Sequence, residues 1–119
     1  MLIAVATKDG ENINQHFGHA SEFQIFEVDR NGVRLIGHRR AGRYCQGGDG
    51  EDEILDAVIA ALDGVSAVLC AKIGRCPAER LAEAGIKTVD DYAFQYIEPA
   101  VAAYFREETA SGSRAASSA

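Results

Sequence analysis

Two nearly uninterrupted apolar runs, at residues 2–7 and 65–71, constrain the fold of this chain more than any other feature. Each run has the length of a strand, and its lack of alternation is typical of a strand that is buried on both faces of a sheet. Such strands occur in α/β proteins, where helices cover both sides of the sheet. We therefore expect an α/β domain built around a central sheet.

The segments around these two runs predict the element order β-β-β-α-β-α-β-α. A strand is expected at 23–28, and the Asn31-Gly32 pair after it signals a hairpin to a third strand at 33–40. Further elements are helices at about 51–63, 76–84 and 94–107 and a short strand at 86–89. The apolar residues that recur at helical spacing form the expected inner faces of these helices: Ile54, Leu55, Val58, Ile59 and Leu62, then Ala78, Leu81 and Ala82, then Ile97, Val101 and Tyr104.

Length and composition favour one domain in a reducing compartment. The 119 residues suit a single domain over residues 1–108, and residues 109–119 are Ser/Ala/Gly-rich and expected to be a disordered tail. The chain shows neither a signal peptide nor an apolar run that could span a membrane, and its three cysteines do not suggest a disulfide framework. We therefore expect a cytoplasmic protein without a membrane partner. The net charge of −6 argues against nucleic acid as a partner.

Connectivity brings the polar loops of the chain to one edge of the sheet. If the first three strands form a meander, the sheet is mixed, has about five strands, and carries the loops 8–21, 41–50 and 72–76 at the same edge. This is the carboxyl edge, where α/β sheets usually bind ligands. It would hold most side chains of the chain that bind soft metals, namely His16, His19, Cys45 and Cys76.

The loop Asn14–His19 is the strongest candidate ligand site. His16 and His19 are three residues apart in a glycine-containing loop, which allows both imidazoles to face one side. Imidazole binds iron, zinc, copper and nickel. The alternative is that either ring only hydrogen-bonds the loop backbone.

The cysteines differ in their surroundings. Cys45 lies in a glycine-rich loop beside Arg43, which favours a thiolate that is suited to iron–sulfur ligation, although an inert surface thiol fits as well. Cys70 lies inside an apolar strand, where a buried structural thiol is expected. Cys76 precedes Pro77 at a helix start, where it either caps the helix or serves as a ligand or redox group.

Several motifs of the chain are specific when they are taken as a set. They are Ile13-Asn14-Gln15-His16-Phe17-Gly18-His19-Ala20, Glu22-Phe23, Gly37-His38-Arg39, Tyr44-Cys45 with Gly47-Gly48-Asp49-Gly50, Leu69-Cys70-Ala71-Lys72-Ile73-Gly74, Pro77 and Ala84-Gly85-Ile86. With these motifs, residues 2–106 resemble the dinitrogenase iron–molybdenum cofactor biosynthesis domain (the NifX/NafY family), in particular the form found in the carboxy-terminal part of NifB proteins.

The resemblance implies a ribonuclease H-like α/β fold without nuclease activity. It also implies that the domain binds or carries an iron–sulfur precursor of the iron–molybdenum cofactor, or the cofactor itself, and works with nitrogenase cofactor assembly proteins. By the same resemblance His16 is the cofactor and metal ligand, with Cys45 and His19 as further ligands of the NifB-like form. Three arginines, Arg39, Arg40 and Arg43, would balance the charge of an anionic cluster.

Alternatives from other functional classes remain open at this point. One alternative is an interaction or regulatory module that docks on nitrogenase assembly proteins. Another is a small metal-dependent enzyme, although the chain lacks a clear set of a catalytic base and metal-binding carboxylates. NifB proteins also carry a radical S-adenosylmethionine domain with a C-x-x-x-C-x-x-C motif, which this sequence does not contain. We therefore expect a non-catalytic domain, either a stand-alone carrier or a domain cut from such an enzyme.

Overall fold

A computed structural model describes the backbone of residues 1–20, 22–40 and 51–118, and their side chains except those of residues 19, 51–54 and 110–118. The element order predicted from the sequence is confirmed. The elements are β1 (Leu2–Val5), the short 3-10 helix η1 (Phe17–His19), β2 (Glu22–Asp29), β3 (Gly32–Arg40), α1 (Glu51–Ala61), β4 (Ala67–Leu69), α2 (Arg75–Glu83), β5 (Lys87–Val89) and α3 (Ile97–Ser118).

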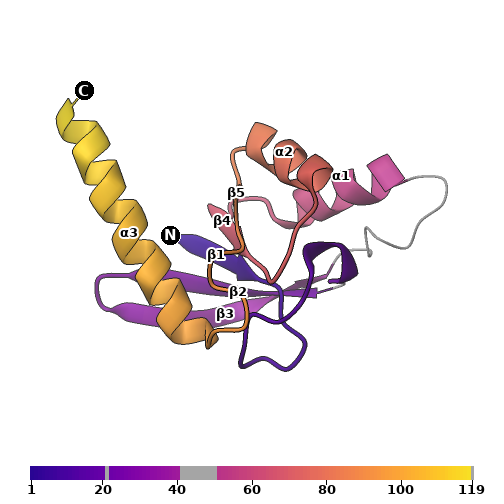
Figure 1. The fold of residues 1–119 in the computed structure, drawn as a ribbon, viewed down its shortest axis with the longest axis horizontal. Coiled ribbons are helices and arrows are strands. Elements are labelled where there is room, and N and C mark those ends of the chain that lie inside the picture. The colour runs from indigo at the N-terminus through magenta and orange to yellow at the C-terminus, as the bar shows by residue number, and fades with distance from the viewer. Residues whose placement is uncertain (21, 41–50, 119) are drawn as a thin grey trace.

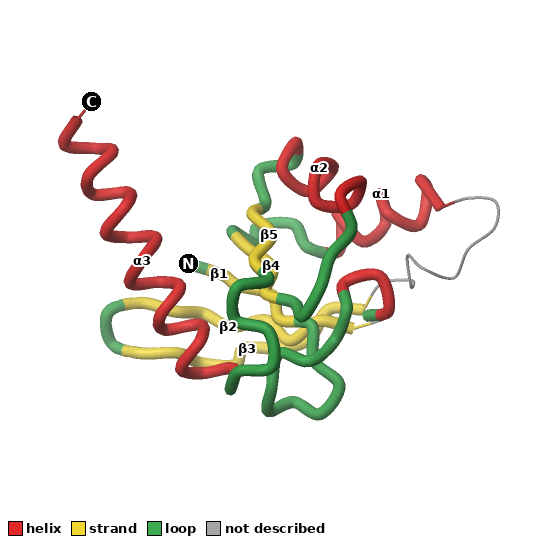
Figure 2. The backbone as a smooth tube through the Cα atoms, viewed as in Figure 1, coloured by secondary structure: helices red, strands yellow, loops and turns green. Residues whose placement is uncertain are grey.

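The strands form one mixed sheet of five strands in the order β3-β2-β1-β4-β5. β2 runs antiparallel to both β1 and β3, so the predicted meander is confirmed. β1, β4 and β5 run parallel to one another. Figure 2 shows that helices make the return connections between the parallel strands, as the length of a crossover requires. The predicted mixed α/β sheet is therefore present.

Helices pack on both faces of the sheet, and β1 separates two cores. Ala4 and Ala6 belong to the core beneath α1 and α2, whereas Ile3 and Val5 belong to the core beneath α3. This division follows from the alternation of side chains along a strand. Figure 1 shows α1 and α2 side by side, with α3 crossing the sheet apart from them. The burial of β1 on both faces explains its continuous apolar run.

The β2–β3 hairpin forms one side of the sheet. Asn31-Gly32 connects the strands as predicted, and Gly32 has a φ of 142°, a conformation that favours glycine. The register shifts between Ile25 and Phe26, which face Gly37 and Leu35 respectively. This bulge lets the edge strand β3 twist relative to β2.

Most of the predicted inner faces of the helices are confirmed. In α1 and the turn after it Leu55, Val58 and Leu62 are buried and Ile59 is half-buried, while the Ile54 side chain lies outside the described residues. In α3 Ile97, Val101 and Tyr104 are buried.

The structure corrects the prediction at α2. The helix buries Pro77 and Leu81, whereas Ala78 is half-buried and Ala82 is exposed. Residues four apart lie on one helix face, and the next residue lies about 100° away from it, so a stripe through Pro77 and Leu81 leaves Ala82 toward solvent.

The structure also differs from the prediction at both ends of α3. The helix begins at Ile97 because Phe94 has a φ of 66°, which lies outside the range of a right-handed helix. At the other end it continues to Ser118, into the segment that is predicted to be a disordered tail. The domain boundary at residue 108 therefore stays a prediction.

Candidate functional site

The carboxyl ends of β1, β4 and β5 lie at one edge of the sheet because these strands are parallel. β3 also ends there, since β2 is antiparallel to both of its neighbours. The loop after β1 therefore meets the loop after β4, as predicted from connectivity, and it also meets the loop after β5, which was not predicted. Residues 41–50, which follow β3, lie outside the described residues.

Ile13 ties the loop after β1 to the loop after β5. Its N–H donates to the carbonyl of Gln95 across 2.9 Å, and its carbonyl accepts from the N–H of Phe94 across 2.8 Å. An isolated bridge between Asn12 and Tyr96 extends this pairing. The backbone of residues 12–13, just before His16, is thus paired with residues 94–96 after β5.

Phe17 ties the same loop to the loop after β4. Its N–H donates to the carbonyl of Lys72 across 2.8 Å, and the carbonyl of Gln15 accepts from the N–H of Ala71 across 2.9 Å. His16 and Lys72 are paired as an isolated parallel bridge. The backbone around His16 is therefore held by its neighbours on both sides along the chain.

The side chains of Ile13 and Phe17 lie in opposite cores. Ile13 is fully buried in the core beneath α3, and Phe17, only 1% exposed, is buried beneath α1 and α2. The Phe17 ring also packs on Phe23, with 5.7 Å between the ring centroids. His16, between these two buried side chains, is exposed at the sheet edge. The loop crosses from one core to the other and presents the imidazole on a fixed backbone.

Asp9 organises the start of this loop. Its Oδ1 accepts backbone hydrogen bonds from Glu11 at 2.9 Å and Asn12 at 3.0 Å, and its Oδ2 accepts from the Asn14 side chain at 3.2 Å. These bonds, led by the one from Glu11, lower the pKa of the Asp9 carboxyl below its ordinary value because they stabilise its charged form. Asp9 thus has a structural role in the approach to His16.

Of the other two predicted metal ligands, His19 and Cys45, the structure describes only the backbone of His19. η1 begins directly after His16 and includes the backbone of His19, whose side chain lies outside the described residues. Cys45 and Arg43 lie outside the described residues as well. Among the side chains that the structure describes, no group of three His, Cys, Asp or Glu residues could hold a metal ion. The predicted ligand set of His16, Cys45 and His19 stays a prediction.

The arginines of β3 are engaged within the fold. The Arg39 guanidinium donates to the carbonyls of Ala61, across 3.2 Å, and Asp63, so it caps the end of α1. These carbonyls hold the Arg39 guanidinium at the end of α1, and its role beside an anionic cluster stays a prediction. Arg40 lies 3.8 Å (Nε–Oε2) from the Glu22 carboxylate, and its side chain is 87% exposed.

His38 lies on the other oxygen of the same carboxylate. Its Nε2 is 3.9 Å from Oε1 of Glu22. Both residues line a polar cavity of about 280 Å³ together with Thr7, Lys8, Asp9, Gly10 and Gln24. The Glu22 carboxylate at the start of β2 therefore lies close to both His38 and Arg40 of β3.

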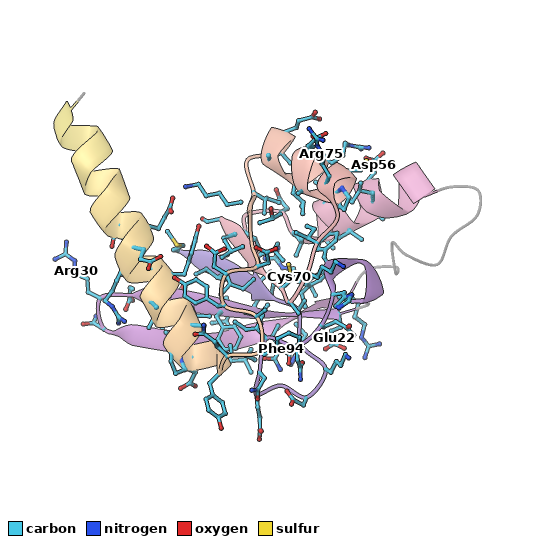
Figure 3. The ribbon with its side chains drawn as sticks, viewed as in Figure 1. Glu22, Arg30, Asp56, Cys70, Arg75 and Phe94 are labelled. Carbon is cyan, nitrogen blue, oxygen red and sulfur yellow. The ribbon has the colours of Figure 1, made fainter. Side chains whose placement is uncertain are left out.

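The two described cysteines lie in different environments. Cys70 is buried, as predicted, and burial followed by the nearby Asp90 carboxylate raises its pKa to about 12. Figure 3 places Cys70 in the interior and Arg75 at the start of α2. Cys76, the residue after Arg75, is exposed. The N-cap position of α2 is Gly74, so the capping role considered for Cys76 is wrong.

Sequence reasoning missed two features of this part of the molecule. One is Lys72, which the bridge to His16 places at the candidate site; its position directly after a buried strand was the available signal. The other is a cavity of about 490 Å³ that is lined by Leu35, Phe26, Tyr96 and Pro99 among others. Leu35 and Tyr96 are 50% and 67% exposed, and no periodic pattern marks either of them.

Comparison with known proteins identifies the family. A family model described as dinitrogenase iron-molybdenum cofactor matches residues 1–107. The chain belongs to this family. The FeMo cofactor biosynthesis protein NifB of Rhodobacter capsulatus is 59% identical over 107 residues, which cover 90% of this chain and 24% of that protein. The protein of the same name from Azotobacter vinelandii is 51% identical over 115 residues, which cover 94% of this chain and 23% of that protein.

The family and these relatives connect the domain to iron–molybdenum cofactor biosynthesis and nitrogen fixation. The chain spans about a quarter of the length of the curated relatives that it matches. The crystal structure of PH0822 has a TM-score of 0.55 to this domain at 21% identity, covering 75% of this chain and 77% of that chain. This likeness supports the α/β fold. None of the helices in the described part of the chain is long and apolar enough to cross a membrane.

Proposed function

We propose that this domain binds an iron–sulfur precursor of the iron–molybdenum cofactor, or the cofactor itself, and carries it during cofactor biosynthesis. The observation that carries the proposal is the presentation of His16: an exposed imidazole on a backbone that is paired on both sides and held by two buried neighbours. A ligand on such a backbone needs little ordering when it binds. His16 is the first ligand, and Cys45 and His19 complete the site.

The chemistry of the proposed ligands suits this cargo. Imidazole and thiolate are both established ligands of iron and of iron–sulfur clusters. An exposed position lets a preformed cluster enter without opening the fold. We assign no catalytic step to this domain and propose that it acts as a carrier beside a cluster-building enzyme, whether fused to it or separate.

Anaerobic titration with a synthetic four-iron four-sulfur cluster, ligated by mercaptoethanolate, tests the carrier proposal. The complete chain should bind the cluster and shift its visible absorption, and His16→Ala and Cys45→Ala should each weaken binding by about tenfold or more. His38→Ala is the matched control, because this exposed histidine faces Glu22 instead. Binding by both ligand variants that equals the binding of the unaltered chain would refute the carrier role.

A second function, docking to nitrogenase cofactor assembly proteins, is favoured by the exposed apolar side chains around the larger cavity. Leu35 and Tyr96 line it, and Phe94 nearby in sequence is 68% exposed. Exposed apolar patches of this kind often mark interaction sites. Replacing Tyr96 by Ser should then weaken association with an assembly partner while cluster binding stays unchanged.

The remaining assignments extend the same proposal. The strand order with an antiparallel β2 supports a ribonuclease H-like classification of the sheet. We further propose a cytoplasmic location, where thiols stay reduced and iron–sulfur clusters are assembled, and a functional domain that ends near residue 108.

A further inference from the structure

The proposed cargo is an anion, and Arg39 and Arg40 of β3 already have partners within the fold. Iron–sulfur clusters with sulfide and thiolate ligands are anions, and a neutral imidazole ligand leaves that charge uncompensated. Arg39 is bound to the carbonyls of Ala61 and Asp63. Arg40 lies against Glu22. A cation that recognises the cargo should instead lie beside His16.

Lys72 is a cation that lies beside His16. It is the bridge partner of His16, and paired strands lie about 4.8 Å apart. Residues that pair in a β-bridge project their side chains to the same face, and both of these side chains are exposed. The loop that carries Lys72 passes beside η1 in Figure 1.

Lys72 is also available for binding. Several other described cations are paired: Arg75 with Glu79, Arg80 with Asp56, and Lys87 with Glu108. Within the described residues, by contrast, the Lys72 ammonium has no ion-pair partner. Its charge can therefore act on a ligand at the neighbouring imidazole.

We propose that Lys72 recognises the negative charge of the iron–sulfur cargo and positions it on His16. The inference rests on the proposed function and narrows the cargo to anionic clusters. Lys72 is a positioning residue and does not bind iron. When a thiolate-ligated cluster docks, the His16 nitrogen forms a bond to one iron, and the thiolate on that iron leaves and takes a proton from solvent. No electron is transferred.

The synthetic cluster dianion described above tests the inference, with the complete chain titrated at low and high ionic strength. Lys72→Ala should weaken binding by roughly tenfold at low ionic strength, as expected for one charge acting on a dianion about 7 Å away in water. The deficit should shrink at high ionic strength because salt screens exposed charges. Lys72→Arg should restore binding to within about threefold, since it keeps the charge.

Arg106→Ala is the control, because it removes the same charge from an exposed position on α3. The hydrogen bonds of Lys72 to the loop use its backbone, so Lys72→Ala should unfold in urea like the unaltered chain. If Lys72→Ala binds the cluster as well as Arg106→Ala does, or if its loss of affinity is independent of salt, the inference about Lys72 is wrong. Weaker cluster binding by His16→Ala would still support the carrier proposal in that case. If the unaltered chain takes up no cluster, both proposals fail.

Discussion

Phe17 donates its backbone N–H to the carbonyl of Lys72 across 2.8 Å, at the residue directly after His16. This bond joins the loop after β1 to the loop after β4, which are far apart in sequence. The buried Phe17 ring and the bond together fix where the His16 backbone lies. The site is thus built on two strand ends of the sheet and is held by packing as much as by hydrogen bonding.

Replacing Phe17 by Ala should lower the free energy of unfolding by about 3–5 kcal/mol, because it leaves a cavity in the core beneath α1 and α2. Urea denaturation measures this change. Phe94→Ala is the matched control, since its ring is 68% exposed, and it should change stability by less than about 0.5 kcal/mol. Similar losses in both variants would contradict the role assigned to the buried ring.

Gly85→Ala should destabilise the domain by about 1–2 kcal/mol through its backbone alone. Gly85 has a φ of 84°, and an added Cβ would meet no atom within 4 Å, so no clash contributes. Gly37→Ala is the control, because its Cβ also meets nothing and its φ lies outside the left-handed region. Thermal unfolding of the two variants should show a lower midpoint only for Gly85→Ala.

Asp9→Asn should lose stability in a pH-dependent way. Backbone hydrogen bonds hold the pKa of Asp9 below its ordinary value of 3.8, so the ionised carboxylate stabilises the folded state. That contribution is fully present above the unfolded pKa and is lost as the pH falls through the lower, folded pKa. Urea denaturation from pH 7 to pH 3 should therefore show a gap between Asp9→Asn and the unaltered chain that narrows below about pH 4. A gap that widens toward acid pH would be the opposite of this expectation.

Alkylation should distinguish the two described cysteines. Cys76 is exposed, whereas Cys70 is buried and has its pKa raised to about 12 by burial. The thiolate is the reactive form, so iodoacetamide at pH 8 should modify Cys76 first, and Cys70 only when the chain unfolds. Peptide mass spectrometry resolves the sites, and labelling in urea gives the control in which both react. Equal rates in the folded protein would show that Cys70 is accessible.

Local patterns predicted the order and type of the elements because each depends on nearby residues. The continuous apolar run at residues 2–7 indicated β1, and Asn31-Gly32 indicated the hairpin. The patterns failed where the backbone conformation of a single residue interrupts regular structure. Phe94, with its positive φ, does so just before α3. They also placed Ala82 on the inner face of α2, because periodicity alone does not show how wide the contact of a helix is.

The candidate site was predicted in part. The histidines and the loops that meet at the sheet edge followed from spacing and connectivity, and the structure confirms the meeting of the loops after β1 and β4. The loop after β5 also lies there and was not predicted. The pairing of His16 with Lys72 and the capping of α1 by Arg39 were not predictable. Both depend on which residues far apart in sequence come into register.

The sequence by itself determined the class of fold, the order of the elements along the chain, the meander of the first three strands, and the family to which the chain belongs. Only the tertiary structure decided which cations are already engaged within the fold and which stand beside His16. The physical reason is that periodicity and turn signals act over a few residues, whereas the position of a charged side chain depends on contacts across the sheet. Arg39 and Lys72 carry the same charge in the sequence, yet one holds the end of a helix and the other adjoins the proposed ligand.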